Sequence, residues 1–94
     1  MSQATIRIPT PLRTFTAGAA EVTVEGDTVA EALHSLTKVH AGLKRQILND
    51  EDELRNFVNI FVGDKNIRSL AGLESPVPEG AIIHIVPAVA GGGS

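Results

Sequence analysis

The stretch Thr28-Val29-Ala30-Glu31-Ala32-Leu33-His34-Ser35-Leu36-Thr37-Lys38-Val39 decides the fold. Thr28 and Glu31 have the spacing of a capping box, in which each side chain satisfies a free backbone N–H at the start of a helix. Apolar residues then recur at helical spacing and form one apolar stripe, made up of Val29, Ala32, Leu33, Leu36 and Val39. The pattern predicts a single amphipathic helix that ends near Gly42.

The segments around this helix have the pattern of β-strands. Apolar residues alternate with polar ones or form short β-branched runs. The pattern occurs in residues 4–8, 21–25, 57–62 and 81–86, with a short additional strand predicted at Ile67. Pro9 and Pro11 predict a stiff loop through Gly18, and Leu43 with residues 47–48 predicts a short turn that buries apolar side chains.

The order of these elements is strand, strand, helix, strand, short strand, strand. One helix covers only one face of a sheet, so the arrangement is predicted to be α+β. The β-grasp (ubiquitin-like) fold has this order, with a mixed sheet of four to five strands packed on one main helix. We expect one such domain over residues 1–87 and a flexible glycine-rich tail over residues 88–94.

Composition excludes several classes of function. The chain has 94 residues and no cysteine, so disulfides, thiolate metal sites and thiol catalysis by this chain are excluded. A net charge of −3 without a basic run argues against nucleic-acid binding. No apolar stretch approaches the roughly 18 residues of a membrane span. A soluble, cytoplasmic protein is expected.

The C-terminal segment Pro87-Ala88-Val89-Ala90-Gly91-Gly92-Gly93-Ser94 follows the last predicted strand. Pro87 has no N–H for a sheet, so the strand is predicted to end before it. Terminal glycines are typical of a frayed end or an added linker. They also suit a tail that enters a narrow channel and presents a carboxylate with no Cβ beside it.

Several motifs resemble the ubiquitin-like sulfur carriers of the ThiS/MoaD group, over nearly the whole chain. They are residues 6–13 (Ile-Arg-Ile-Pro-Thr-Pro-Leu-Arg), 26–29 (Gly-Asp-Thr-Val), 57–62, 67–68 and, most specifically, 86–92 (Val-Pro-Ala-Val-Ala-Gly-Gly). The opening and the ending resemble most closely the CysO-type carriers of cysteine biosynthesis.

The resemblance implies a protein cosubstrate, not an enzyme. No cofactor is expected on the chain itself. An E1-like adenylating enzyme uses ATP to activate the terminal glycine carboxylate, and a sulfur donor converts the acyl adenylate to a thiocarboxylate. A pyridoxal-phosphate-dependent cysteine synthase then accepts the sulfur on an aminoacrylate. A metalloprotease is the third expected partner, because it trims the tail or releases cysteine.

The resemblance also assigns roles to the tail. The family's last glycine falls on Gly92, which is the expected sulfur-carrying terminus, and Gly93 is the alternative after loss of Ser94. The residues expected to thread into a partner are Ala88, Val89, Ala90 and Gly91. A fully extended tail from Ala88 to Gly92 spans about 17 Å. The terminal Gly93-Ser94 fits either a processed precursor or residues added for expression.

The second candidate site is the sheet face that the helix leaves open. Strand alternation predicts that Val58, Ile60 and Val62 face the helix. The residues left for partner docking on the open face are Phe57, Asn59, Phe61, His84 and Arg7. Aromatic side chains among polar ones are typical of a protein-docking surface. A phenylalanine that only covers the sheet edge is the alternative.

Other polar residues give no site. His34 and His40 fall on different faces of the predicted helix, so no metal site is expected. The carboxylates of residues 50–53 are consecutive in a predicted loop and indicate a solvated surface. Three alternatives to a cysteine-pathway carrier stay open: a molybdopterin synthase small subunit, a ubiquitin-like protein modifier, and an interaction domain with an inert tail.

Overall fold

The structure, a computed structural model, describes residues 2–87. Its centre is a five-stranded sheet in the order β2-β1-β5-β3-β4. The strands are β1 (Gln3–Arg7), β2 (Glu21–Glu25), β3 (Val58–Val62), β4 (Lys65–Asn66) and β5 (Ala81–Pro87). β1 and β5 are parallel, and the other neighbours are antiparallel. The predicted mixed sheet and the α+β, β-grasp architecture are confirmed.

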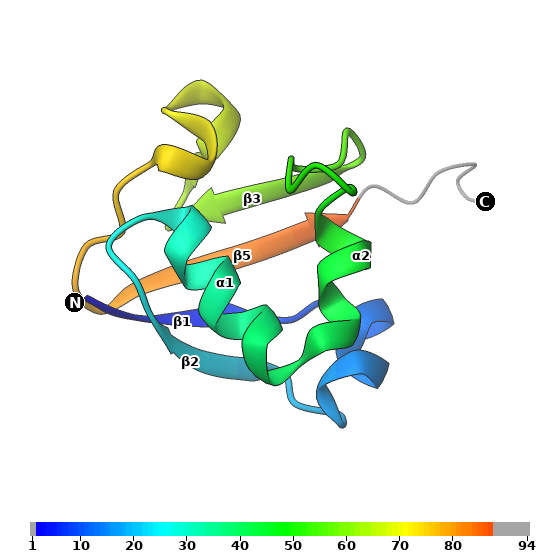
Figure 1. Ribbon diagram of the computed structural model, residues 1–94. Coiled ribbons are helices and arrows are strands. Elements are labelled where there is room, and N and C mark those ends of the chain that lie inside the picture. The colour runs from blue at the N-terminus through cyan, green and yellow to red at the C-terminus, as the bar shows by residue number, and fades with distance from the viewer. Residues whose placement is uncertain (1, 88–94) are drawn as a thin grey trace.

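Helix α1 (Val29–Val39) and the short helix α2 (Lys44–Ile47) lie on the same side of this sheet (Figure 1). The predicted capping box forms in part, because the bond of the Glu31 side chain goes to the residue before the N-cap. Thr28 Oγ1 accepts the N–H of Glu31 at 3.2 Å, but the Glu31 carboxylate accepts the N–H of Asp27 at 2.7 Å.

None of the helices within residues 2–87 has the length and apolar character that a membrane span requires.

The core lies between the sheet and these helices. It includes Ile6, Ile60 and Ile83 from the strands and Leu33 and Leu36 from α1, all essentially inaccessible to solvent. Leu43 and Ile47 are fully buried too, so the predicted short turn that buries apolar side chains is confirmed. Each fully buried aliphatic side chain contributes roughly 1.5–3 kcal/mol through loss of apolar surface.

One member of the predicted apolar stripe is misplaced. Val39 is 73% exposed, although Val29, Ala32, Leu33 and Leu36 are buried as predicted. Val39 is the last residue of α1 and lines a surface hollow beside the edge strand β2, together with Val22 and Val24. The prediction was wrong because spacing alone does not reveal that the helix ends at the rim of the sheet.

Three local predictions are also corrected. Residues 10–16 form a 3₁₀ helix and not a loop; Pro11 is in its first turn, where the fixed φ of proline suits a helix. Phe57 lies in the turn before β3 and not in the strand. Ile67 begins a 3₁₀ turn after β4, where it is fully buried. For Ile67, burial in the core outweighs the β propensity of its side chain.

Gly26 brings β2 close to the start of α1. A Cβ at this position would lie 2.6 Å from the backbone nitrogen of Ala32 and 2.8 Å from the carbonyl carbon of Glu31. Because backbone atoms of a packed helix yield little, we expect Gly26→Ala to lower the free energy of unfolding by about 3 kcal/mol. Urea unfolding followed by circular dichroism measures this change.

Gly18→Ala is the matched control. Its φ is +87°, and nothing lies within 4 Å of the position of a new Cβ. Only backbone strain opposes this substitution, so its expected cost is about 1 kcal/mol. Equal losses for the two variants would contradict the close approach at Gly26.

Candidate functional site

The tail begins at the end of β5, the central strand of the sheet, and Figure 1 shows this end beside α2. Residues 88–94 lie outside the described residues, so the expected roles of Gly92, Gly93 and residues 88–91 are not tested by the structure. The described residues do establish how the end of β5 is held at Pro87.

Pro87 is the last residue of β5, so the prediction that the strand ends before it was wrong. The register explains why. The N–H of Gly63 donates to Ile82 at 2.8 Å, and bonded pairs then alternate along the two strands. The pair Val58–Pro87 therefore exchanges no hydrogen bonds, and the missing N–H of Pro87 costs the β3–β5 ladder nothing.

Arg68 holds the start of β3, where Val58 pairs with Pro87 at the end of β5. Its Nη2 donates to the carbonyl oxygens of Val58 at 2.7 Å and Arg55 at 2.8 Å. Its Nε donates to Oδ1 of Asn59 at 3.2 Å, and that oxygen also accepts Nδ2 of Asn66 at 3.3 Å. Arg68 thus joins the turn before β3 to the segment after β4. No spacing pattern in the sequence indicates this role.

The open face of the sheet carries the predicted docking residues. Arg7 and Phe61 are both register partners of His84, so these three side chains form a row across the sheet. Asn59 lies on this face too, but its amide oxygen is already occupied by Arg68 and Asn66. Phe57, placed just before β3, is 44% exposed. The structure therefore brings the predicted residues together without testing their binding.

Sequence reasoning missed two apolar members of this face. Ile82 and Val86 are 43% and 44% exposed, while Ile83 and Ile85 between them are buried. Strand alternation in the run 81–86 was the available signal. We define the open-face patch by five residues: Phe57, Phe61, Ile82, His84 and Val86. Its grouping of exposed apolar side chains on one face is typical of an interaction surface.

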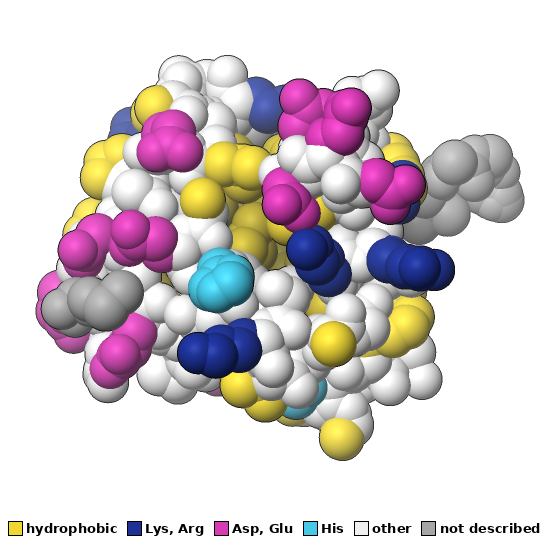
Figure 2. All heavy atoms as spheres, viewed as in Figure 1, with side chains coloured by type: hydrophobic (Ala, Val, Ile, Leu, Met, Phe, Trp, Pro, Cys, Tyr) yellow, Lys and Arg dark blue, Asp and Glu magenta, His cyan; other side chains and the backbone are white. Residues whose placement is uncertain are grey.

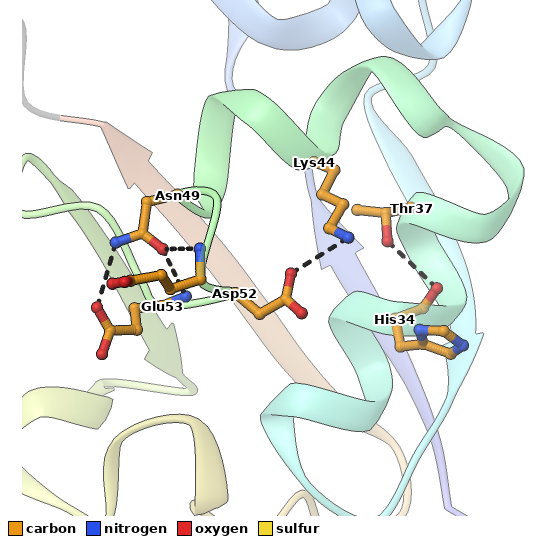
Figure 3. A network of polar contacts seen from close by, with 7 residues as sticks. His34, Thr37, Lys44, Asn49, Asp52 and Glu53 are labelled. Carbon is orange, nitrogen blue, oxygen red and sulfur yellow. Dashed lines mark hydrogen bonds and ion pairs between the residues drawn. The ribbon is translucent and has the colours of Figure 1, made fainter.

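The other side of the molecule has a hollow of about 410 Å³ between α1 and the segment after α2. Figure 2 shows apolar side chains at its bottom and charged ones around it. In Figure 3, Lys44 points to Asp52 across its edge, at 3.2 Å. Both side chains are more than half exposed, so this ion pair contributes little stability.

The acidic segment at this hollow is a self-contained turn. Oδ1 of Asn49 accepts the N–H groups of Glu51 at 2.8 Å and Glu53 at 3.0 Å (Figure 3). Residues 50–53 are all exposed, as predicted for a solvated surface. Within residues 2–87, no three histidine or carboxylate side chains are grouped as metal ligands.

Comparison with known proteins extends these observations. The sequence profile of the ThiS family matches residues 6–92. The sulfur carrier protein CysO of Mycobacterium tuberculosis is 36% identical over 90 residues, which cover 94% of this chain and 97% of that protein. A putative sulfur carrier protein of Archaeoglobus fulgidus is 34% identical over 87 residues, covering 93% and 96%.

Solved structures agree with this assignment. A chain in the crystal structure of the Amycolatopsis orientalis BexX/CysO complex has a TM-score of 0.87 at 42% identity and covers 94% of this chain and 98% of its own. The small archaeal modifier protein 1 of Methanosarcina acetivorans has a TM-score of 0.86 at 33% identity, with 97% of each chain covered. The chain therefore belongs to the ThiS family and is a small protein of the sulfur-carrier type.

Proposed function

We propose that this chain is adenylated and then thiocarboxylated at Gly92 and donates its sulfur for cysteine biosynthesis. The single observation that carries the proposal is the family match, which continues beyond the folded domain and ends at Gly92. A profile that matched the β-grasp domain alone would say nothing about the tail. Here the match includes Ala88 to Gly92. Likeness to CysO supports the cysteine pathway.

The chemistry uses the chain as a substrate. A terminal carboxylate oxygen attacks the α-phosphorus of ATP, and pyrophosphate leaves. Sulfide from a donor then attacks the acyl carbon, and AMP leaves with the bonding electron pair, so the thiocarboxylate forms without oxidation or reduction. Glycine suits this step because no Cβ hinders attack on the acyl carbon. Gly93 is the alternative terminus if Ser94 alone is removed.

The proposed partners follow from this chemistry. An E1-like enzyme performs the adenylation, and a pyridoxal-phosphate-dependent cysteine synthase accepts the sulfur. A metalloprotease removes the residues after the terminal glycine or releases cysteine. The open-face patch is proposed as the docking surface for the activating enzyme, since it lies on β5, the strand that leads into the tail, and at the neighbouring β3.

Intact mass spectrometry of the chain isolated from its native host tests this proposal. The expected species has lost Gly93 and Ser94, or Ser94 alone, and has gained the mass difference of one oxygen replaced by sulfur. A full-length mass that stays unchanged with the activating enzyme, ATP and sulfide would overturn the proposal.

Val86→Ser tests the docking surface. Val86 is 44% exposed in the open-face patch, and loss of its apolar contact is expected to raise the KM of the activating enzyme for the carrier about tenfold. The measurement is pyrophosphate release at varied carrier concentration. Leu70→Ser is the control, because Leu70 is 46% exposed but lies outside the patch. Equal KM values for the two variants would contradict docking through the patch.

A ubiquitin-like protein modifier is the second candidate function. The likeness to small archaeal modifier protein 1, at 33% identity, favours it. Modification forms an isopeptide bond to lysine, whereas sulfur donation leaves the carrier unattached to other proteins. An immunoblot for the carrier in host lysate separates the two candidates. A ladder of high-mass adducts that resists thiols supports modification.

A further inference from the structure

We propose that the free edge of β2 binds an extended segment of a partner protein with the pattern basic–aliphatic–any–aliphatic–basic. This binding adds a strand to the sheet beside β2. It goes beyond the proposed sulfur transfer, because the edge of β2 is separate from the open-face patch on β3 and β5. In Figure 1, β2 forms one side of the sheet next to α1.

The backbone of β2 presents unused hydrogen-bonding groups at this edge. The N–H of Ile8 donates to the carbonyl of Ala20 at 2.8 Å, and the N–H of Gly26 donates to the carbonyl of Ser2 at 2.9 Å. With the β1–β2 register, these bonds show which residues of β2 point their backbone groups toward β1. By alternation, the N–H and C=O groups of Glu21, Thr23 and Glu25 point away from β1. Among the described contacts, only the carbonyl of Glu25 has an outer partner, the hydroxyl of Ser35 at 2.7 Å.

The side chains beside this edge select for aliphatic residues. Val22 and Val24 face α1, and with Ser35 and the exposed Val39 they line a hollow of about 340 Å³. An added strand places the two residues opposite Val22 and Val24 over this hollow, because side chains of paired residues share a face. Its aliphatic side chains there cover Val39, which the domain itself leaves 73% exposed.

The charges at the ends of β2 select for basic residues. Glu21 and Glu25 are exposed and lie on either side of Thr23, so residues paired with them face a carboxylate at each end. Glu21 already contacts Arg7, but at 3.7 Å with both side chains about half exposed, which leaves it open to a second partner. Opposite charges on paired strand positions stabilise the pairing, and like charges oppose it.

The same charges argue against a second copy of this chain as the occupant. Antiparallel pairing of Glu-Val-Thr-Val-Glu with itself, centred on Thr23, places Glu21 opposite Glu25 at both ends. The valines would match, but carboxylates would repel each other at each end. A strand with lysine or arginine at these two positions keeps the apolar match and replaces repulsion with attraction.

Titration of the ¹⁵N-labelled full chain with a peptide tests the proposal. The probe is the capped peptide Gly-Ser-Lys-Ile-Thr-Val-Arg-Ser-Gly, and the control probe replaces its lysine and arginine with glutamate. We expect amide shift changes confined to residues 20–26 and 35–40 for the basic probe, and at least about fivefold weaker binding of the acidic probe.

Charge reversal on the protein provides the decisive comparison. Glu25→Lys is expected to weaken binding of the basic probe about fivefold and to strengthen binding of the acidic one. Asp64→Lys makes the same charge change in the β3–β4 turn at the opposite side of the sheet and is expected to change neither. Absence of binding at millimolar probe, shifts centred on the open-face patch, or self-association through β2 would overturn the proposal.

Discussion

A chain that ends at Gly92 and carries Gly92→Val is expected to form thiocarboxylate about 100-fold more slowly than the same chain with glycine. The reacting carbon is the carbonyl carbon of this residue, and a branched Cβ beside it obstructs both adenylation and attack by sulfide. A displacement of about 1 Å at a reacting centre is enough for a loss of this size. Single-turnover mass spectrometry with the activating enzyme, ATP and sulfide measures the rate.

The fold provides the control for this prediction. Position 92 follows the described domain, which ends with β5 at Pro87. Thermal unfolding of the variant is therefore expected to match that of the parent chain, so a slower reaction reports chemistry and not unfolding. Leu70→Ser, which lies outside both the tail and the open-face patch, is expected to react at nearly the parent rate. An unchanged rate for Gly92→Val would contradict the requirement for a terminal residue without a Cβ.

The sequence predicts the elements whose burial is periodic. The stripe of α1 and the alternation of Val58, Ile60, Ile83 and Ile85 identify the buried faces, because a helix and a strand each expose one side to the core. From one helix and these strands the β-grasp arrangement follows, and so does the open face that carries Phe61 and His84. These are the parts of the candidate site that local patterns determine.

Contacts between distant segments were not predictable in this way. Arg68 holds carbonyl groups of Arg55 and Val58, and the reach and direction of its side chain depend on the β3–β4 turn. Val39 satisfies the helical period but lies exposed in the hollow beside the edge strand β2, which only the tertiary arrangement reveals. The prediction for Pro87 was wrong because the pairing register decides whether a strand residue needs its N–H, and local sequence patterns do not reveal that register.

Leu36→Ala is expected to lower the free energy of unfolding by about 3 kcal/mol. Leu36 is completely buried between α1 and the sheet, so truncation removes apolar contacts and leaves a cavity that the surrounding strands cannot close. For a domain of this size the midpoint of thermal unfolding should fall by about 15 °C. Differential scanning calorimetry measures the change.

Val39→Ala in the same helix separates burial from helix propensity. Both substitutions introduce alanine, a better helix former than either parent residue, but Val39 is 73% exposed. Its expected effect is therefore within about 0.5 kcal/mol of zero. A large loss for Val39→Ala would mean that this side chain packs in the core as the stripe alone suggests. It would then also be absent from the hollow beside β2, and the apolar selectivity proposed for that edge would have no basis.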